Sequence, residues 1–135
     1  MVFNMKKLLV VIFMCCIICF SSCGITAKGI TIEESEGYTK VVLDNFSGEA
    51  KFEIKKNSNG ECGLYYYADI TKGNVTVYYD QGWLWDEYKL FTSDVNSVVN
   101  GGGEYIDNST SKITIIIKTE TLTSGEILLG FNQFE

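Results

Sequence analysis

The chain has 135 residues and a formal net charge of −6, and it contains no histidine, no proline and no arginine, since every basic residue is a lysine. The missing histidine excludes imidazole catalysis and histidine-ligated zinc. The missing arginine removes the bidentate clamp for phosphate or carboxylate, and an acidic chain without arginine is poorly suited to nucleic acid. We therefore expect neither an enzyme nor a nucleic-acid partner.

The N-terminus has the features of a signal peptide. Lys6-Lys7 form a basic region, and 13 consecutive apolar residues follow, Leu8 to Phe20. A helix that crosses a bilayer needs about 20 apolar residues, so this run is too short and has the length of a signal-peptide core. Both Met1 and Met5 are acceptable translation starts, and residues 1–22 are expected to be removed.

The residues at the end of this segment, Phe20-Ser21-Ser22-Cys23-Gly24, resemble the lipobox of bacterial lipoproteins. In that family the cysteine thiol receives a diacylglyceryl group, and lipoprotein signal peptidase cuts just before the cysteine. The resemblance implies that Cys23 is the lipidated first residue of a protein held at the outer face of the bacterial cytoplasmic membrane. Ordinary signal-peptidase cleavage after Ala27 is the alternative.

Charge and cysteine content agree with a lipid anchor. From Cys23 onward the chain has 113 residues, with 9 lysines against 17 acidic residues and thus a net charge of −8. This charge disfavours adhesion to anionic lipid, so membrane attachment must come from acyl chains. Cys62 is the only other cysteine of the mature chain, which leaves no internal disulfide. We expect a monomer that needs neither metal nor cofactor.

The mature chain has the pattern of short strands separated by Gly, Asn, Asp and Ser clusters. Residues 23–37 are expected to be a tether, with Ile30 and Ile32 as the start of an edge strand in the alternative interpretation. The expected strands are 38–46, 50–55, 64–70, 75–79, 83–92, 104–106, 113–117 and 125–131, with turns at 46–49 and 71–74. No helix-length apolar stripe is present. The pattern predicts an all-β antiparallel β-sandwich or jelly roll of about eight short strands, spanning residues 38–135.

Period-two alternation assigns side chains to faces. Ile113, Ile115 and Ile117 form the sharpest apolar face and are expected in the core, opposite a partly wet face that ends at Lys118. Tyr66 shares its face with Leu64 and is likewise expected inside.

A second resemblance concerns the turns. Lys72-Gly73-Asn74-Val75-Thr76-Val77, Asp80-Gln81-Gly82 and Ser124-Gly125-Glu126 resemble a recurring pattern in small uncharacterised secreted lipoproteins of Gram-positive bacteria. The resemblance implies a β-sandwich and brings no known catalytic residue.

The aromatic density between residues 65 and 88 is the feature most open to a functional interpretation. β-Sandwich glycan-binding modules display exposed aromatic rings that stack on sugars. The candidate ligand-binding residues are Tyr65, Tyr67, Tyr78, Trp83 and Trp85. The alternative is structural, because Tyr and Trp are favoured on half-exposed sheet faces in any case.

The carboxylates are poorly arranged for chemistry. Asp86 and Glu87 are adjacent and point to opposite faces of a strand, which is wrong for an acid–base pair. Asp69 and Asp80 flank the expected turn at 71–74, where solvated charge is a simpler explanation than a metal site. The sequence therefore predicts a lipid-anchored extracytoplasmic β-sandwich with a non-catalytic interaction or surface-structural role. The alternative function is a carbohydrate or cell-wall-fragment binding module, and the partner is a glycan or a protein.

Overall fold

The computed structural model describes residues 25–56, 62–81, 87–106 and 112–134, and the regular structure of these residues is entirely β-strand. The strands are β1 (Ile25–Ala27), β2 (Ile30–Ser35), β3 (Tyr38–Lys55), β4 (Cys62–Lys72), β5 (Asn74–Asp80), β6 (Tyr88–Asp94), β7 (Val99–Ile106) and β8 (Lys112–Gly130). The described part of the chain has no helix long and apolar enough to span a membrane.

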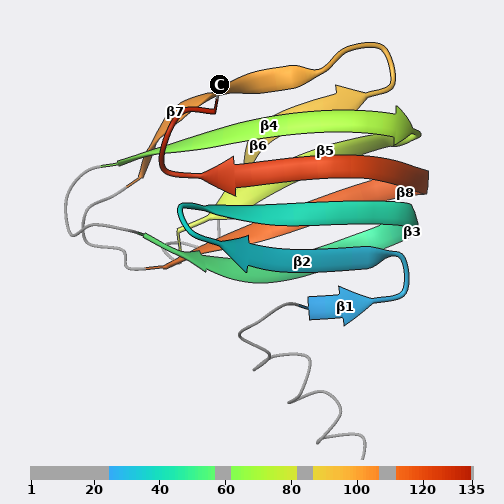
Figure 1. Cartoon of the computed structure of the whole chain (residues 1–135), viewed down its shortest axis with the longest axis horizontal. Coiled ribbons are helices and arrows are strands. Elements are labelled where there is room, and N and C mark those ends of the chain that lie inside the picture. The colour runs from blue at the N-terminus through green and yellow to red at the C-terminus, as the bar shows by residue number, and fades with distance from the viewer. Residues whose placement is uncertain (1–24, 57–61, 82–86, 107–111, 135) are drawn as a thin grey trace, which may run out of the picture.

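One antiparallel sheet is folded over on itself, so that its long strands run through both layers (Figure 1). β3 pairs with β8 along almost its whole length, from Tyr38 opposite Gly130 to Lys55 opposite Lys112. On the other side of β8, β4 and β5 lie end to end, β4 beside the second half of β8 and β5 beside the first half.

The two layers differ in size. The larger layer has the order β1-β2-β3-β8-β4-β7 and uses the first half of β3 with the second half of β8. The smaller layer joins the other halves of β3 and β8 to β5 and β6. The stacked rings of Tyr66 on β4 and Phe91 on β6, with centroids 4.4 Å apart, mark the contact between the two layers.

The sheet bends along a line, here called the fold line, that crosses β3, β8 and the junction of β4 and β5, where the sequence is rich in Gly, Ser, Thr and Asn. β3 bends at two register shifts between Leu43 and Gly48, and Asn45 has a positive φ of 51° there. Polar side chains replace ladder hydrogen bonds at this bend. The Asn45 backbone N–H donates to Ser124 Oγ at 2.9 Å, and the Gly48 N–H donates to Thr119 Oγ1 at 3.0 Å.

The core lies between the layers and is aliphatic with a few rings. Ile113, Ile115 and Ile117 are each 0% exposed, as the alternation predicts. Leu64 is also fully buried, and Tyr66 packs against the core from the same face. The buried polar side chains of the described residues are all hydroxyls: Thr39, Ser93, Thr119 and Thr123.

The all-β sandwich expected from the sequence is confirmed, with differences in how the strands connect. The expected turn at 46–49 is wrong, because β3 continues through it as a bulged bend. Likewise the strands expected at 113–117 and 125–131 belong to one strand, β8. At 71–74 the chain makes no hairpin, since β4 and β5 each pair with β8 and not with one another.

The expected tether is also corrected in part. Residues 30–35 form β2, which pairs with β3, and Ile30 and Ile32 are only 3% and 5% exposed. The alternative interpretation of these two isoleucines as the start of a strand is therefore right, but β2 is not an edge strand, because β1 pairs with it at both residues. The boundary at residue 38 is too late, because the sandwich already includes β1 and β2.

Candidate functional site

The outer face of the larger layer gathers aromatic side chains from three strands. The registers place Tyr38 on β3 and Tyr65 on β4 on either side of Gly130 of β8. In the next row, Tyr67 of β4 lies beside Leu128 of β8. Tyr38 is 38% exposed, and Tyr65 and Tyr67 are half-buried.

Glycines shape the surface around Tyr65. A methyl group added at Gly63 or Gly102 would lie 3.3 Å or 3.1 Å from the Tyr65 ring. Gly103 is the extra residue of the β7 bulge opposite Leu64, and a methyl group added there would lie 3.9 Å from the same ring. The ring therefore rests close to bare backbone, which keeps bulky neighbours away from this part of the face.

The C-terminal residues add a fourth ring. Phe134 lies over Gly130, where an added methyl group would be 3.3 Å from its ring, and it meets Tyr38 edge-on with centroids 6.3 Å apart. Asn100 Nδ2 of β7 donates to the Phe134 carbonyl at 3.5 Å. Together Tyr38, Tyr65, Tyr67 and Phe134 form what we call the outer aromatic face.

Charged and polar side chains border these rings. Lys40 of β3 forms an ion pair of 3.6 Å with Glu126 of β8, and Leu128 separates Lys40 from Tyr67 in the register. Glu33 of β2 lies on the other side of Lys40. The face thus combines flat apolar surface with hydrogen-bonding groups, which is the composition of small-molecule sites.

Tyr78 does not join this face. It lies on β5 in the smaller layer, on the side opposite the core residues Val77 and Tyr79. Lys118 Nζ lies 4.7 Å from the centroid of its ring and 2.9 Å from Glu87 Oε2. The hydrogen bond to Glu87 raises the pKa of Lys118 above its ordinary value.

Tyr78 lies beside a buried isoleucine, Ile116 of β8. It lies between Tyr78 and Lys51 in the register, on the outer side of the smaller layer, yet it is only 2% exposed. The expectation of a partly wet face around it is therefore wrong at this position. The Tyr78 ring thus lies beside Ile116 and beneath Lys118, in the other layer from Tyr65 and Tyr67.

Three predicted site residues, Cys23, Trp83 and Trp85, lie outside the described residues. Asp69 and Asp80 do not meet, because Asp69 pairs with Glu126 in the larger layer and Asp80 with Thr114 in the smaller one. No cluster of three or more metal-ligating side chains occurs in the ranges that the structure describes.

Tyr38 and Phe134 were not predicted as members of the outer aromatic face. Alternation along residues 38–43 points Tyr38 away from Thr39 and Val41, so its outward direction was accessible from sequence. Its place beside Gly130 depends on the β3–β8 register, which no local signal supplies. Phe134 lies beyond the last strand, and only the return of the chain toward β7 brings it to the face.

No protein-family model matches this sequence, and no curated protein matches it either. Among solved structures, a variant of a family 29 carbohydrate-binding module gives a TM-score of 0.45 at 13% identity, covering 76% of this chain and 74% of that one. A family 61 module solved with β-1,4-galactotriose gives 0.41 at 11% identity, covering 76% of this chain and 66% of that one, just under two thirds. The Drosophila melanogaster CENP-C cupin domain gives 0.40 at 11% identity, covering 81% and 74%.

Proposed function

We propose that this protein is a non-catalytic binding module, anchored outside the cell membrane through Cys23, whose outer aromatic face binds carbohydrate. The observation that carries the proposal is the grouping of four rings on one side of the larger layer, among paired charges and bare glycine backbone. A sugar ring has apolar C–H faces and a hydroxyl edge, so it matches aromatic surface bordered by hydrogen-bonding groups.

The surroundings of the rings support a binding role over a purely structural one. Tyr78, in the smaller layer, has a close cation partner and a buried neighbour, which account for it. Tyr67 has Leu128 and Asn100 as register neighbours and stays half-buried, so part of its ring is available to a ligand. Flat rings on a rigid sheet bind at low cost in conformational entropy.

Truncation of the rings tests the proposal. The expected result is that Tyr65→Ala and Tyr67→Ala each weaken binding of a glycan or muropeptide about tenfold, since a ring in a binding patch typically contributes more than about 1 kcal/mol. Tyr88→Ala is the matched control, because Tyr88 is 50% exposed but belongs to β6 of the smaller layer.

The measurement is a glycan and muropeptide array followed by calorimetry on each variant. If no glycan binds, or if Tyr88→Ala weakens binding as much as the other two changes, the carbohydrate proposal fails. A non-catalytic role toward a protein partner would then be the proposed function.

The anchor has its own test. A chain that starts at Cys23 with a diacylglyceryl addition is the expected product in intact-mass analysis of the membrane fraction. Two acyl chains hold a protein stably where one gives only marginal binding, so Cys23→Ala should move the protein out of the lipid-modified membrane pool. Wild-type protein found only in the medium, with Lys28 as its first residue, would contradict the anchor.

A further inference from the structure

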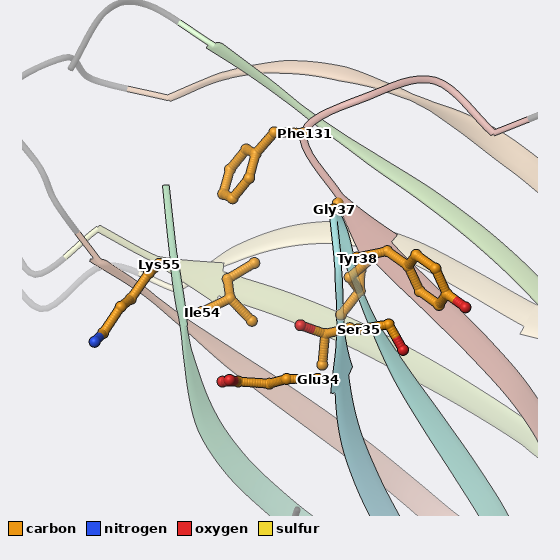
Figure 2. A pocket seen from close by; sticks show the side chains of 10 residues that line it. Glu34, Ser35, Gly37, Tyr38, Ile54, Lys55 and Phe131 are labelled. Atoms are coloured by element: carbon orange, nitrogen blue, oxygen red, sulfur yellow. The ribbon is translucent and has the colours of Figure 1, made fainter. Parts of the chain in front are cut away.

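A cavity of about 160 Å³ opens at the end of the sandwich that lies opposite the fold line (Figure 2). It lies where β2 turns into β3 and where β3 and β8 end. Its lining comes from both layers: Glu34, Ser35, Gly37, Tyr38, Thr39, Ile54, Lys55, Leu129, Gly130 and Phe131.

One wall carries polar groups on an otherwise apolar inner face. Glu34 pairs with Thr39, and Thr39 pairs with Leu129, so these three side chains lie side by side on the inner face of the larger layer. Glu34 follows the buried Ile30 and Ile32 on this face of β2 and ends their row with a carboxylate. Glu34 is exposed, so its carboxylate is solvated at the end of this row and accessible to a ligand.

The polar groups of this wall are unused within the protein. Thr39 is only 7% exposed, and its hydroxyl makes no hydrogen bond to the described residues. Glu34 is exposed, and none of the ion pairs between described residues includes it. The only buried side-chain oxygen without a partner among the described residues is that of Ser93, so water reaches the Thr39 hydroxyl, and a ligand hydroxyl can take the place of that water.

The opposite wall is apolar. Ile54 of the smaller layer is 4% exposed, and Phe131 packs against the core from the end of β8. Figure 2 shows the Phe131 ring at the opening above Ile54, with Glu34 at the far rim and the Lys55 side chain extending away from Phe131. A ligand here would meet an aromatic ring on one side and a carboxylate with a hydroxyl on the other.

The volume limits what fits. A cavity of about 150 Å³ binds one benzene molecule, so this one admits a single six-membered ring. A ring held between Phe131 and the Glu34–Thr39 pair needs an apolar face for the first and hydroxyl donors for the second. We propose that the cavity binds one hydroxylated six-membered ring, the terminal unit of a saccharide, with hydrogen bonds to Glu34 and Thr39 and with Phe131 against its C–H face.

This inference rests on the proposed function. It adds that the protein recognises the terminal unit of the saccharide. Tyr38 and Gly130 line the cavity and also belong to the row that carries the outer aromatic face. A saccharide lying over Tyr65 and Tyr67 can therefore reach the cavity with its last ring. The protein would then prefer chain ends over internal segments.

Two adjacent leucines allow a sharp experiment. Leu129 lines the cavity, whereas Leu128 lies beside Tyr67 on the outer aromatic face. The probes are glucose, galactose and N-acetylglucosamine at millimolar concentration and one oligosaccharide of each. The measurement is methyl NMR of the isoleucine- and leucine-labelled membrane-extracted chain in detergent micelles.

We expect at least one monosaccharide to shift the methyl signals of Leu129 and Ile54 and to leave Leu128 unchanged. Thr39→Val and Glu34→Gln should each weaken this binding about tenfold, the typical loss for one hydrogen bond to a polar or charged group. Glu53→Gln is the matched control, because Glu53 is an exposed carboxylate next to the cavity-lining Ile54 but faces the outer side of the smaller layer. It should leave monosaccharide binding unchanged.

The outcomes separate the two proposals. If no monosaccharide moves Leu129 and Ile54, or if Thr39→Val and Glu34→Gln leave their shifts undiminished, the cavity proposal is overturned. An oligosaccharide that shifts Leu128 alone would retain the outer aromatic face and reject the cavity. An oligosaccharide that shifts Leu129 but not Leu128 would retain the cavity and reject the face.

Discussion

Replacing Ile115 by alanine is expected to lower the free energy of unfolding by about 2–5 kcal/mol, the usual cost of truncating a buried isoleucine. Ile115 is 0% exposed and lies in the middle strand of the smaller layer, between Phe52 of β3 and Tyr79 of β5. Strands on both sides prevent the site from collapsing around the lost atoms. The loss would be a large share of the roughly 5–15 kcal/mol that stabilises a domain.

Tyr65→Ala is the comparison for this prediction. Tyr65 is half-buried on the outer face, so its truncation should cost less than about 1 kcal/mol. Urea unfolding of the two variants, followed by circular dichroism, measures both values. If Tyr65→Ala proved more damaging than Ile115→Ala, the assignment of inner and outer faces would be inverted.

The second large loss of stability is expected for Gly73→Ala. Gly73 joins β4 to β5 on the fold line. Its φ is +75°, a conformation that costs an L-residue roughly 1–2 kcal/mol. A methyl group there would also lie 2.6 Å from the Leu122 carbonyl oxygen and 2.6 Å from Thr123 Oγ1. Neither can move freely, because Thr123 is 0% exposed and its hydroxyl donates to the Asn74 carbonyl at 2.9 Å.

Gly37→Ala separates the backbone cost from the steric one. Gly37 has a similar φ of +88°, but no atom lies within 4 Å of an added methyl group. We expect Gly37→Ala to cost about 1–2 kcal/mol and Gly73→Ala to cost clearly more, as measured by thermal and urea unfolding. Equal costs would mean that the fold line yields to an added methyl group.

Local sequence patterns were enough to predict which side chains face the core wherever one face of a strand is exposed and the other is buried. The alternation of Leu64, Tyr66 and Ala68 with larger, partly exposed neighbours gives the correct inner face of β4. Ile113, Ile115 and Ile117 of β8 were placed in the core for the same reason. Both assignments need only the period of two residues.

The bends of the sheet at the fold line could not be predicted from local sequence patterns. Residues 46–49 contain Ser and Gly, which are typical of turns. In the structure the backbone there is satisfied by a residue far along the chain, since Thr119 Oγ1 accepts from the Gly48 N–H and donates to the Phe46 carbonyl at 3.3 Å. A pattern of turn residues cannot distinguish a reversal of the chain from a bend shared by three strands.

The sequence predicted only some of the residues that lie on the outer aromatic face, for a related reason. Tyr65 and Tyr67 were placed correctly on an outer face, because they alternate with buried residues on the same strand. Tyr78 was grouped with them because alternation also points it away from the core, but the bend puts its outer face in the other layer. The cavity was not predicted at all, since Glu34 and Ile54 meet only through the folding of the whole sheet.

The position of β8 has a consequence for the order in which the chain can assemble. Its partners in β3 lie 57 to 92 residues earlier, from Lys55–Lys112 to Tyr38–Gly130, so the central strand is synthesised last and folding in milliseconds to seconds is expected for such distant pairing. Until β8 has been made, β3 on one side and β4 and β5 on the other lack the strand that lies between them. The isoleucine run of β8, residues 113–117, combines high β-propensity with no charge, a composition that favours aggregation. It leaves the ribosome when both neighbouring strands have already been made, and Lys112 and Lys118 flank it as charged gatekeepers.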